Sequence, residues 1–465
     1  MAITSINPYN GETIAEYTEN TPQELEQIIR RANDAFQKWQ HEPVSVRAGY
    51  LAKVADLLET RSEEASEIIT NEMGKLLGES RAEIKLTISI LRYYAEHSEH
   101  FLQDQEVESP IGKATVQYRP IGVILGIEPW NFPFYQIVRM AAPNIACGNT
   151  VIMKQASNVT GCALFFQKLF DDADVPNGVY NTIILSGSKT SDLLNNDRIA
   201  GVSLTGSEKA GAVVASVAAK NLKKSVMELG GSDALIVLDE VDLDKAVDLA
   251  MVARMSNAGQ VCISSKRIIL HKNIADGFMT RLNEKLSLLK PGNPLEKETS
   301  LAPVNTENAL ETLLDQVKRA VDNGATLVQG GKKIETDGFF MEPAVLTGIT
   351  PENPLFYEEM FGPIVVYYIA ENDDEAIKIA NNSHYGLGGA VFSSNIERAK
   401  QVASKIEAGM VFINTPTISA PELPFGGIKR SGYGRELSGD GLHEFVNKKL
   451  INVNETGNFG PVFSV

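Results

Sequence analysis

Residues 121–127 read Ile-Gly-Val-Ile-Leu-Gly-Ile, and this apolar stretch begins the series of segments that decides the fold. Downstream of it, short apolar stretches of strand length alternate with longer segments of helical character. The expected strands cover residues 123–127, 150–153, 181–185, 201–204 and 234–238, and further on 267–270, 364–369, 390–392 and 410–413. Strands that alternate with helices predict βαβ units. The fold class is therefore α/β, with a mainly parallel sheet covered by helices and a second α/β domain after it.

The first hundred residues or so are expected to be helical. Thr21-Pro22-Gln23-Glu24 combines a capping box with a proline at the first helical position. Further helices are expected from about Val44 and from about Glu79 to Leu102. Residues 107–119 contain the turn-like Pro110-Ile111-Gly112-Lys113 and predict a projecting hairpin of the kind that joins subunits, although a plain surface loop is an equal alternative.

The composition bounds the class of protein. Of the 465 residues, 43% are apolar and 22% charged, as in a globular enzyme. The formal net charge of −16 excludes a nucleic-acid partner, because phosphate binding requires clustered cations. The N-terminus has no secretory signal, and no apolar run approaches the roughly 20 residues of a membrane span. Cys147, Cys162 and Cys262 are too irregularly spaced for a disulfide framework or a zinc site. We expect a cytoplasmic protein with no metal and no membrane partner.

The chemistry is expected in the segment Asn257-Ala258-Gly259-Gln260-Val261-Cys262-Ile263. Upstream of it, Glu228 is followed by Leu229, Gly230 and Gly231. A cysteine thiolate is a strong nucleophile, and a nearby carboxylate can serve as its base. Each feature alone also has an ordinary explanation. A lone cysteine is commonly a small buried hydrophobe, and Glu-Leu-Gly-Gly is commonly a strand end with a turn.

Two further segments suggest ligand contacts. Thr205–Gly211 follows an expected strand and opens a helix, so a pyrophosphate could lie near its N–H groups, although the segment lacks the usual glycine fingerprint. Pro129–Pro133 holds Asn131 between two aromatic residues. A fixed amide N–H₂ group can donate to a developing oxyanion. The alternatives are an ordinary glycine-rich turn and an asparagine that only satisfies a turn.

Taken in order, six segments resemble those of the NAD(P)-dependent aldehyde dehydrogenase superfamily. They are Pro129–Pro133, Thr205–Ser207, Glu228–Gly231, Gly259–Cys262, Glu358–Pro363 and Pro424–Gly427. The separation between Glu228 and Cys262 also matches that family. The resemblance implies a Rossmann-like cofactor domain, an α/β catalytic domain and a small β arm that joins subunits.

The resemblance also implies a reaction. Cys262 attacks the aldehyde carbon, and the Asn131 side chain and the Cys262 backbone N–H hold the oxyanion. After hydride transfer to nicotinamide, Glu228 activates the water that hydrolyses the thioester, and Glu436 matches a second carboxylate that assists proton transfer. Trp130 and Phe425 wall the substrate tunnel. The implied cofactor contacts are Trp130, Lys154, Ser157, Thr205, Gly206, Ser207, Gly211, Leu229, Glu359 and Phe361.

Departures from the family pattern refine the cofactor and the regulation. Ser157 stands where strictly NAD-dependent members usually carry a glutamate, which would repel a 2′-phosphate. Lys154 supplies positive charge nearby, so NADP⁺ is the preferred cofactor and NAD⁺ the second. Ser264 replaces a second cysteine found in some relatives, so no local disulfide switch is expected.

The substrate is expected to be an aldehyde with a distal carboxylate. Arg139 matches the position of an arginine that binds this carboxylate in relatives acting on succinic semialdehyde, and Ser419 aligns with a serine that adds a hydrogen bond. A structural ion pair is the alternative for Arg139. A second family arginine is replaced by Ser256, and Arg254 would point elsewhere. The resemblance is greatest to the bacterial succinate-semialdehyde dehydrogenase branch.

These observations predict an NADP-preferring dehydrogenase that oxidises succinic semialdehyde to succinate and forms a homodimer or homotetramer. Another short semialdehyde or a neutral aldehyde is the alternative substrate. A CoA-acylating enzyme and a non-enzymatic member of the superfamily are rivals that the presence of Glu228, Cys262 and Asn131 disfavours. The expected division is a cofactor domain at 1–105 and 121–231, a catalytic domain at 232–440, an oligomerisation arm at 106–120 and 441–455, and a tail at 456–465.

Overall fold

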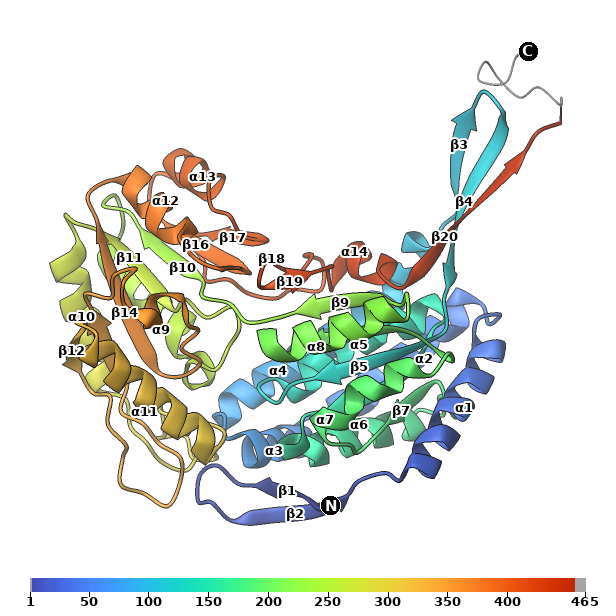
Figure 1. Ribbon diagram of the computed structural model, residues 1–465, viewed down its shortest axis with the longest axis horizontal. Helices are drawn as coiled ribbons and strands as arrows, with labels where there is room; N and C mark the ends of the chain where they lie inside the picture. The colour runs from blue at the N-terminus through green and yellow to red at the C-terminus, as the bar shows by residue number, and fades with distance from the viewer. Residues whose placement is uncertain (1, 456–465) are drawn as a thin grey trace.

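The computed structural model describes residues 2–455, and the expected tail at 456–465 lies outside this range. Two α/β units lie side by side, and a β arm projects from one of them (Figure 1). No helix among the described residues combines the length and apolar character needed to cross a membrane.

The first α/β unit is built on a six-stranded sheet in the order β19-β9-β8-β5-β6-β7. Its central strand β5 has β6 and β7 on one side and β8 and β9 on the other, all parallel, while β19 is antiparallel. The order of the parallel strands is that of a Rossmann sheet, and its topological switch point lies between β5 and β8. The strands are β5 (Val123–Glu128), β6 (Thr150–Gln155), β7 (Tyr180–Thr182), β8 (Ile199–Thr205), β9 (Lys224–Glu228) and β19 (Gly432–Tyr433).

Helices α5 (Pro133–Cys147), α6 (Thr160–Asp172) and α8 (Glu208–Lys220) connect these strands. Every residue of α5 is buried, because this helix lies between the sheet and the N-terminal helices. The N-terminal helices are α1 (Pro22–Trp39), α2 (Val44–Thr60), α3 (Ser62–Met73) and α4 (Leu77–Phe101). The expected capping box of Thr21 and Glu24 is present at the start of α1.

The N-terminal residues, which were predicted to be helical, form strands instead. Residues 2–18 form an antiparallel hairpin of β1 (Ala2–Ile6) and β2 (Thr13–Thr18). Its turn contains Gly11 at φ 70°, a left-handed conformation that glycine adopts without strain. The Ser5 hydroxyl donates 2.8 Å to Oε1 of the buried Glu72. The hairpin therefore forms through a turn and a long-range hydrogen bond that helical periodicity does not reveal.

The second α/β unit contains a seven-stranded sheet in the order β12-β13-β14-β11-β10-β16-β17. The expected strands of this unit are present, but its strands β12 and β13 were not predicted, and neither was β9 of the first sheet. The strands are β10 (Ala234–Val237), β11 (Arg267–His271), β12 (Thr326–Gln329), β13 (Ala344–Thr347), β14 (Ile364–Ala370), β16 (Gly388–Phe392) and β17 (Met410–Ile413). The main helices are α9 (Leu243–Met255), α10 (Ala275–Ser287), α11 (Glu307–Asp322), α12 (Asp373–Asn381) and α13 (Ile396–Ala403).

The segment around residues 107–119 forms a hairpin, not a plain loop. Strands β3 (Gln105–Ser109) and β4 (Gly112–Pro120) pair antiparallel, and β20 (Val446–Val453) pairs with the other edge of β4. This three-stranded arm extends away from both units (Figure 1). Its exposed apolar residues are Val107, Ile111, Leu450, Ile451 and Val453.

Candidate active site

A cavity of about 260 Å³ opens at the switch point of the first sheet, where loops follow β5, β8 and β9. Such crevices at the carboxyl ends of parallel strands are the usual ligand sites of doubly wound sheets. The lining residues are Pro129, Trp130, Asn131, Gln136, Thr205, Gly206, Ser207, Leu229, Gly230, Cys262, Glu359 and Phe361. The cavity thus brings together nine predicted site residues from segments far apart in the sequence. These nine are Trp130, Asn131, Thr205, Gly206, Ser207, Leu229, Cys262, Glu359 and Phe361.

The nucleophile segment begins with three consecutive residues in left-handed backbone conformation. Asn257, Ala258 and Gly259 have φ values of 53°, 51° and 76°. Left-handed non-glycine residues are strained by about 1–3 kcal/mol each, so surrounding contacts must hold them. The Asn257 N–H donates 2.7 Å to Oε1 of Glu79 on α4, and its side-chain amide donates 3.0 Å to the Asn131 carbonyl. The nucleophile loop is therefore fixed directly against the segment that carries the expected oxyanion donor.

Arg254 also stabilises the nucleophile loop. Its guanidinium is buried and donates to the carbonyls of Ile364, Gly259 and Met360 and to the Ser264 hydroxyl, at 2.7, 3.2, 3.1 and 2.8 Å. Burial lowers its pKa to about 9. Arg254 therefore points away from the cavity, as its offset from the family arginine predicted.

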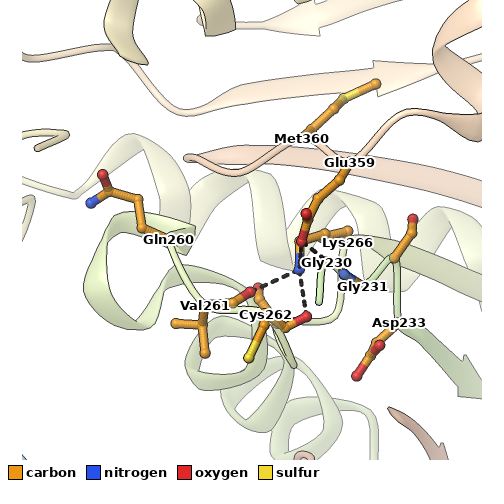
Figure 2. A network of polar contacts seen from close by, with 12 residues as sticks. Gly230, Gly231, Asp233, Gln260, Val261, Cys262, Lys266, Glu359 and Met360 are labelled. Carbon is orange, nitrogen blue, oxygen red and sulfur yellow. Dashed lines mark hydrogen bonds and ion pairs between the residues drawn. The ribbon is translucent and has the colours of Figure 1, made fainter. Parts of the chain in front are cut away.

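A second network holds the backbone on the other side of Cys262 (Figure 2). Lys266 Nζ donates 2.7 Å to each of the Val261 and Cys262 carbonyls and pairs with Glu359 Oε1 at 3.1 Å. The same Glu359 oxygen accepts the Gly231 N–H at 3.0 Å. The sequence did not single out Lys266, because its partners are backbone atoms and a carboxylate from a distant loop.

The two glycines after Glu228 have a steric role in this network. A Cβ atom at Gly230 would lie 2.4 Å from Glu359 Oε2, and one at Gly231 would lie 2.7 Å from the Cys262 carbonyl oxygen. Real Cβ atoms do not approach other atoms this closely. The Glu-Leu-Gly-Gly segment is therefore required for close approach of the carboxylate and of the nucleophile loop.

The Asn131 amide is held on both of its polar atoms. Its Oδ1 accepts from Gln136 Nε2 at 2.9 Å, and its Nδ2 donates to the Gln260 carbonyl at 2.9 Å. One Nδ2 hydrogen is thereby used, and the amide nitrogen keeps a second hydrogen beside the cavity that Cys262 also lines. This arrangement fits the predicted oxyanion donor.

A buried ion pair supports the Asn131 segment. Lys75 Nζ and Glu83 Oε2 are 2.6 Å apart, and both side chains are 0% exposed. Lys75 Nζ lies 3.6 Å from the centre of the Phe132 ring, as in a cation–π contact. Glu83 Oε1 accepts the N–H groups of Phe134 and Tyr135 at 2.8 and 3.1 Å. Helix α4 therefore fixes the segment that carries Asn131 as well as the loop that carries Cys262.

Beneath the cavity lies a buried acidic cluster formed by Glu128, Glu228 and Glu436 around Arg139. In-register pairing places Glu228 beside Thr205 at the ends of β9 and β8. The Glu228 carboxylate is buried and neither of its oxygens has a protein partner among the described residues. Burial, reinforced by Glu436, raises the pKa of Glu228 well above its usual range, and burial also raises that of Glu128. Burial therefore favours the protonated form of Glu228.

Arg139, which we expected to bind a substrate carboxylate, is paired with a carboxylate of the protein in this structure. Arg139 is 1% exposed, and its Nε forms an ion pair with Glu436 Oε2. Its other donors contact Tyr135 Oη at 3.2 Å and Thr205 Oγ1 at 2.8 Å. The structural ion pair, the alternative for this residue, is the arrangement present. Glu436, the partner of Arg139, also accepts from Ser203 Oγ at 3.0 Å.

Phe425 and Ser419 lie outside the lining of the cavity. The Phe425 ring is buried and centred 4.5 Å from the Arg139 guanidinium carbon, so it covers the ion pair instead of walling this cavity. Ser419 Oγ is 2.7 Å from Tyr135 Oη, which also accepts from Arg139. Tyr135 links Arg139 to Ser419 and was not predicted from the sequence.

Three predicted cofactor residues also lie outside the lining. Lys154 is the last residue but one of β6 and is buried, which lowers its pKa, and Ser157 begins a 3-10 turn, Ser157–Val159, and is half-buried. Gly211 lies one turn into α8, where a Cβ atom would be 2.4 Å from Leu229 Cδ2. Packing of α8 against Leu229 therefore requires glycine at position 211.

The thiol is protonated in the resting state. Burial is the main cause that raises the pKa of Cys262 to about 11, while Arg139 and Lys266 lower it, and Glu359 and Asp233 raise it. A base or a change in these charges is therefore required to form the thiolate at neutral pH.

Asp233 gives a prediction about stability. Its Oδ1 accepts the Gly388 N–H at 3.0 Å, its Oδ2 has no protein partner among residues 2–455, and burial raises its pKa to about 7. The unfolded chain loses this proton near pH 4 and the folded chain near pH 7, so stability falls as pH rises between these values. Asp233→Asn should remove that loss, on the order of 1–4 kcal/mol.

Thermal unfolding at pH 5 and pH 8 measures this effect. The variant should gain in Tm over the parent protein at pH 8 relative to pH 5. Asp34→Asn, at an exposed position on α1, is the control and should show no such gain. An equal Tm difference at both pH values would contradict the assignment of the raised pKa to Asp233.

A doubly wound sheet whose switch-point cavity ends on a thiol is the arrangement of a nucleotide-dependent oxidoreductase that works through a cysteine. A family model described as the aldehyde dehydrogenase family matches residues 1–451. The chain therefore belongs to the aldehyde dehydrogenase family.

Individual relatives are similar over nearly the whole chain. A succinate-semialdehyde dehydrogenase named for NADP(+), from Deinococcus radiodurans, is 47% identical over 447 residues, which are 96% of this chain and 94% of that protein. The structure of succinic semialdehyde dehydrogenase from Streptococcus pyogenes in complex with NADP⁺ is 43% identical, with a TM-score of 0.96, and the match covers 97% of this chain and 100% of that one. Betaine aldehyde dehydrogenase from Staphylococcus aureus, solved in complex with NAD⁺, is 32% identical, with a TM-score of 0.95, and the match covers 100% of this chain and 94% of that one. The predicted family and fold are confirmed.

Proposed function

We propose that this protein oxidises succinic semialdehyde to succinate and uses NADP⁺ in preference to NAD⁺. The observation that carries the proposal is the cavity at the switch point, which has the Cys262 residue and the Asn131 amide in its lining. The substrate and the nucleotide named for the similar proteins from Deinococcus radiodurans and Streptococcus pyogenes support the choice of both.

The residues at the N-terminus of α8 suit the binding of a dinucleotide. Ser207 caps α8, and a Cβ atom at Gly206 would meet no atom closer than 3.6 Å, so nothing crowds the N–H groups that begin this helix. Helix N-termini of this kind favour phosphate groups. Ser207 and Gly206 would hold the pyrophosphate, Glu359 the ribose, and Phe361 and Leu229 the nicotinamide. The bound nucleotide accepts the hydride.

The residues of the chain carry the covalent steps. Cys262, once deprotonated, bonds to the aldehyde carbon, and the carbonyl π electrons move to oxygen. The Asn131 amide and the Cys262 N–H donate to that oxyanion. Loss of hydride from the same carbon converts the thiohemiacetal to a thioester. Glu228, after losing its own proton, removes one from water as the water attacks the thioester, and the C–S bond breaks to release the acid and the Cys262 thiolate.

The buried cluster suggests how Glu228 regains its proton. Glu436 is the neighbouring carboxylate that most raises the Glu228 pKa, and its negative charge is balanced by Arg139. The negative charge of Glu436 therefore favours a proton on Glu228, and the Glu436 carboxylate is itself held by Ser203 and Arg139. We propose that Glu436 keeps the pKa of Glu228 high enough for reprotonation in each cycle.

The distal carboxylate of the substrate requires a site other than the Arg139 guanidinium. Because Tyr135 Oη accepts from Arg139, its own proton points to Ser419 Oγ, which leaves the serine hydroxyl hydrogen available to an anion. We propose that Tyr135 and Ser419 receive the carboxylate and that Arg139 acts through Tyr135. Another short aldehyde remains the alternative substrate.

Initial rates with C2 to C6 aldehydes and semialdehydes, each with both nucleotides, test this proposal. The highest kcat/KM is expected for the four-carbon semialdehyde with NADP⁺. Equal kcat/KM for neutral aldehydes of the same length would favour the alternative substrate. Thioester release that depends on added coenzyme A would favour an acylating enzyme, and no NADPH formation with any aldehyde would favour a non-enzymatic role.

Ser157 gives a prediction about cofactor choice. Ser157→Glu should lower kcat/KM for NADP⁺ by about 10²-fold, because two like charges a few ångströms apart repel by up to about 4 kcal/mol near a protein surface. The value for NAD⁺ should change far less. Ser157→Ala is the control, since it removes the hydroxyl without adding charge. Retention of the NADP⁺ rate in Ser157→Glu would place the 2′-phosphate elsewhere.

We also propose a homodimer or homotetramer in the cytoplasm, joined through the arm of β3, β4 and β20. The exposed apolar residues of the arm and its open strand edges support this, because such edges favour pairing with another chain. The proposed domains remain residues 1–105 with 121–231, residues 232–440, and the arm at 106–120 with 441–455. The antiparallel pairing of β19 with β9 indicates that residues 432–433 contribute to the cofactor sheet.

A further inference from the structure

Lys266 is a buried cation that the proposed reaction does not use. It begins the segment that leads into β11, and its side chain is 2% exposed. An isolated buried ammonium is costly, so its partners indicate its role. Its Nζ donates hydrogen bonds to the Val261 and Cys262 carbonyls and forms an ion pair with Glu359 Oε1.

We propose that Lys266 is a positioning residue that couples the cofactor contact Glu359 to the nucleophile Cys262. Two of its hydrogen bonds fix the peptide groups on either side of the nucleophile, and the third interaction fixes the carboxylate expected at the cofactor ribose (Figure 2). The proposal rests on the proposed function for the role of Glu359, and its geometry is independent of the substrate.

Backbone contacts also hold the Glu359 carboxylate close to the nucleophile loop. Glu359 Oε1 also accepts the Gly231 N–H, and the absence of a side chain at Gly231 lets the Cys262 carbonyl approach. Lys266, Glu359 and the Gly230–Gly231 backbone therefore form one closed set of contacts around the Cys262 carbonyl. If the Glu359 carboxylate moves toward a ribose, Lys266 loses the negative charge that balances its ammonium group.

The charges around the thiol give the direction of the effect. Arg139 from α5 and Lys266 stabilise the thiolate, whereas Glu359 and Asp233 oppose it. When Glu359 leaves Lys266 to bind a ribose, the ammonium is less neutralised, and the Cys262 thiol ionises more readily. Binding of the nucleotide and reactivity of the thiol are then linked, and linkage of this kind is reciprocal.

The test measures alkylation of Cys262 by iodoacetamide as a function of pH, with the labelled cysteine identified by mass spectrometry. Cys147 and Cys162 are buried and should not react. In Lys266→Gln, which keeps a donor but removes the charge, the rate at neutral pH should fall about tenfold, equal to a rise of one pKa unit. The Kd for NADP⁺, from titration without aldehyde, should fall, because Glu359 no longer has to leave the ammonium of Lys266 to reach the ribose. Lys297→Gln, an exposed lysine, is the control.

Glu359→Gln provides the opposite arm and remains informative if Lys266→Gln does not fold. Removal of this carboxylate should shift the alkylation profile to lower pH. In the double variant the two effects on alkylation and on NADP⁺ binding should be non-additive, because the residues act through each other. An alkylation profile unchanged in either variant, or strictly additive effects, would overturn the proposal. No step uses an aldehyde, so absence of dehydrogenase activity in the parent protein would count against the proposed function alone.

Discussion

Cys262→Ser should reduce NADPH formation from succinic semialdehyde by at least about 10³-fold, because a serine hydroxyl is a far weaker nucleophile than a thiolate. The loss should appear in kcat, and the Kd for NADP⁺ should remain unchanged, since the backbone around residue 262 is held by Lys266 and by the strained loop at Asn257 and Ala258. Initial rates and a nucleotide titration without aldehyde measure the two quantities.

Cys147→Ala and Cys162→Ala are the matched controls for this prediction. Both cysteines lie on helices, α5 and α6, and are buried, so their substitution tests for general effects of thiol removal. Turnover should change little in either control. A Cys262→Ser protein with turnover near that of the parent would exclude a covalent adduct on this residue.

Glu228→Gln should separate the two halves of the reaction. A burst of about one NADPH per active site should remain, and the steady-state rate should fall by about 10²–10³-fold, since a general base contributes on this order. Thioester hydrolysis is slowed because no carboxylate removes the proton of water. Rapid mixing with succinic semialdehyde and detection of NADPH absorbance measure both phases.

The pH dependence of the same two phases gives the control. Burial raises the pKa of Glu228, so the parent steady-state rate should rise with pH through the neutral range and above, as the base loses its proton. This rise should be absent in Glu228→Gln, while the burst phase should keep the dependence set by Cys262. A variant that loses the burst as well would assign Glu228 to deprotonation of the thiol.

The sequence best predicted the features that depend on residues close together in the chain. Alternating apolar strands predicted both sheets, and short motifs predicted Asn131, Cys262 and Glu359, because each lies in a loop that directly follows or precedes a strand. The N-terminal hairpin was missed for the opposite reason. Its strands are short, and they are held by the turn at Gly11 and by Glu72 of α3.

The partners of buried charges could not be predicted from spacing. Arg139 appeared to need an anion, and the pattern could not tell a substrate from Glu436, which reaches it from the far end of the chain. Lys266 gave no motif, because two of its partners are main-chain oxygens. Gly211 fitted a phosphate loop in sequence, but its small size serves packing against Leu229. Long-range pairing decides such roles.

Helix α4 carries Glu79 and Glu83 one turn apart, and the two carboxylates reach different catalytic segments. Glu79 accepts the N–H of Asn257 in the nucleophile loop, and Glu83 accepts the first N–H groups of α5 after Asn131. The spacing of nucleophile and oxyanion donor is thus set by the pitch of a single distant helix. In a saturation mutagenesis survey, most substitutions on this face of the helix should reduce activity, although no substrate lies nearby. Homologous enzymes that are engineered by loop grafting should therefore keep this helix unchanged.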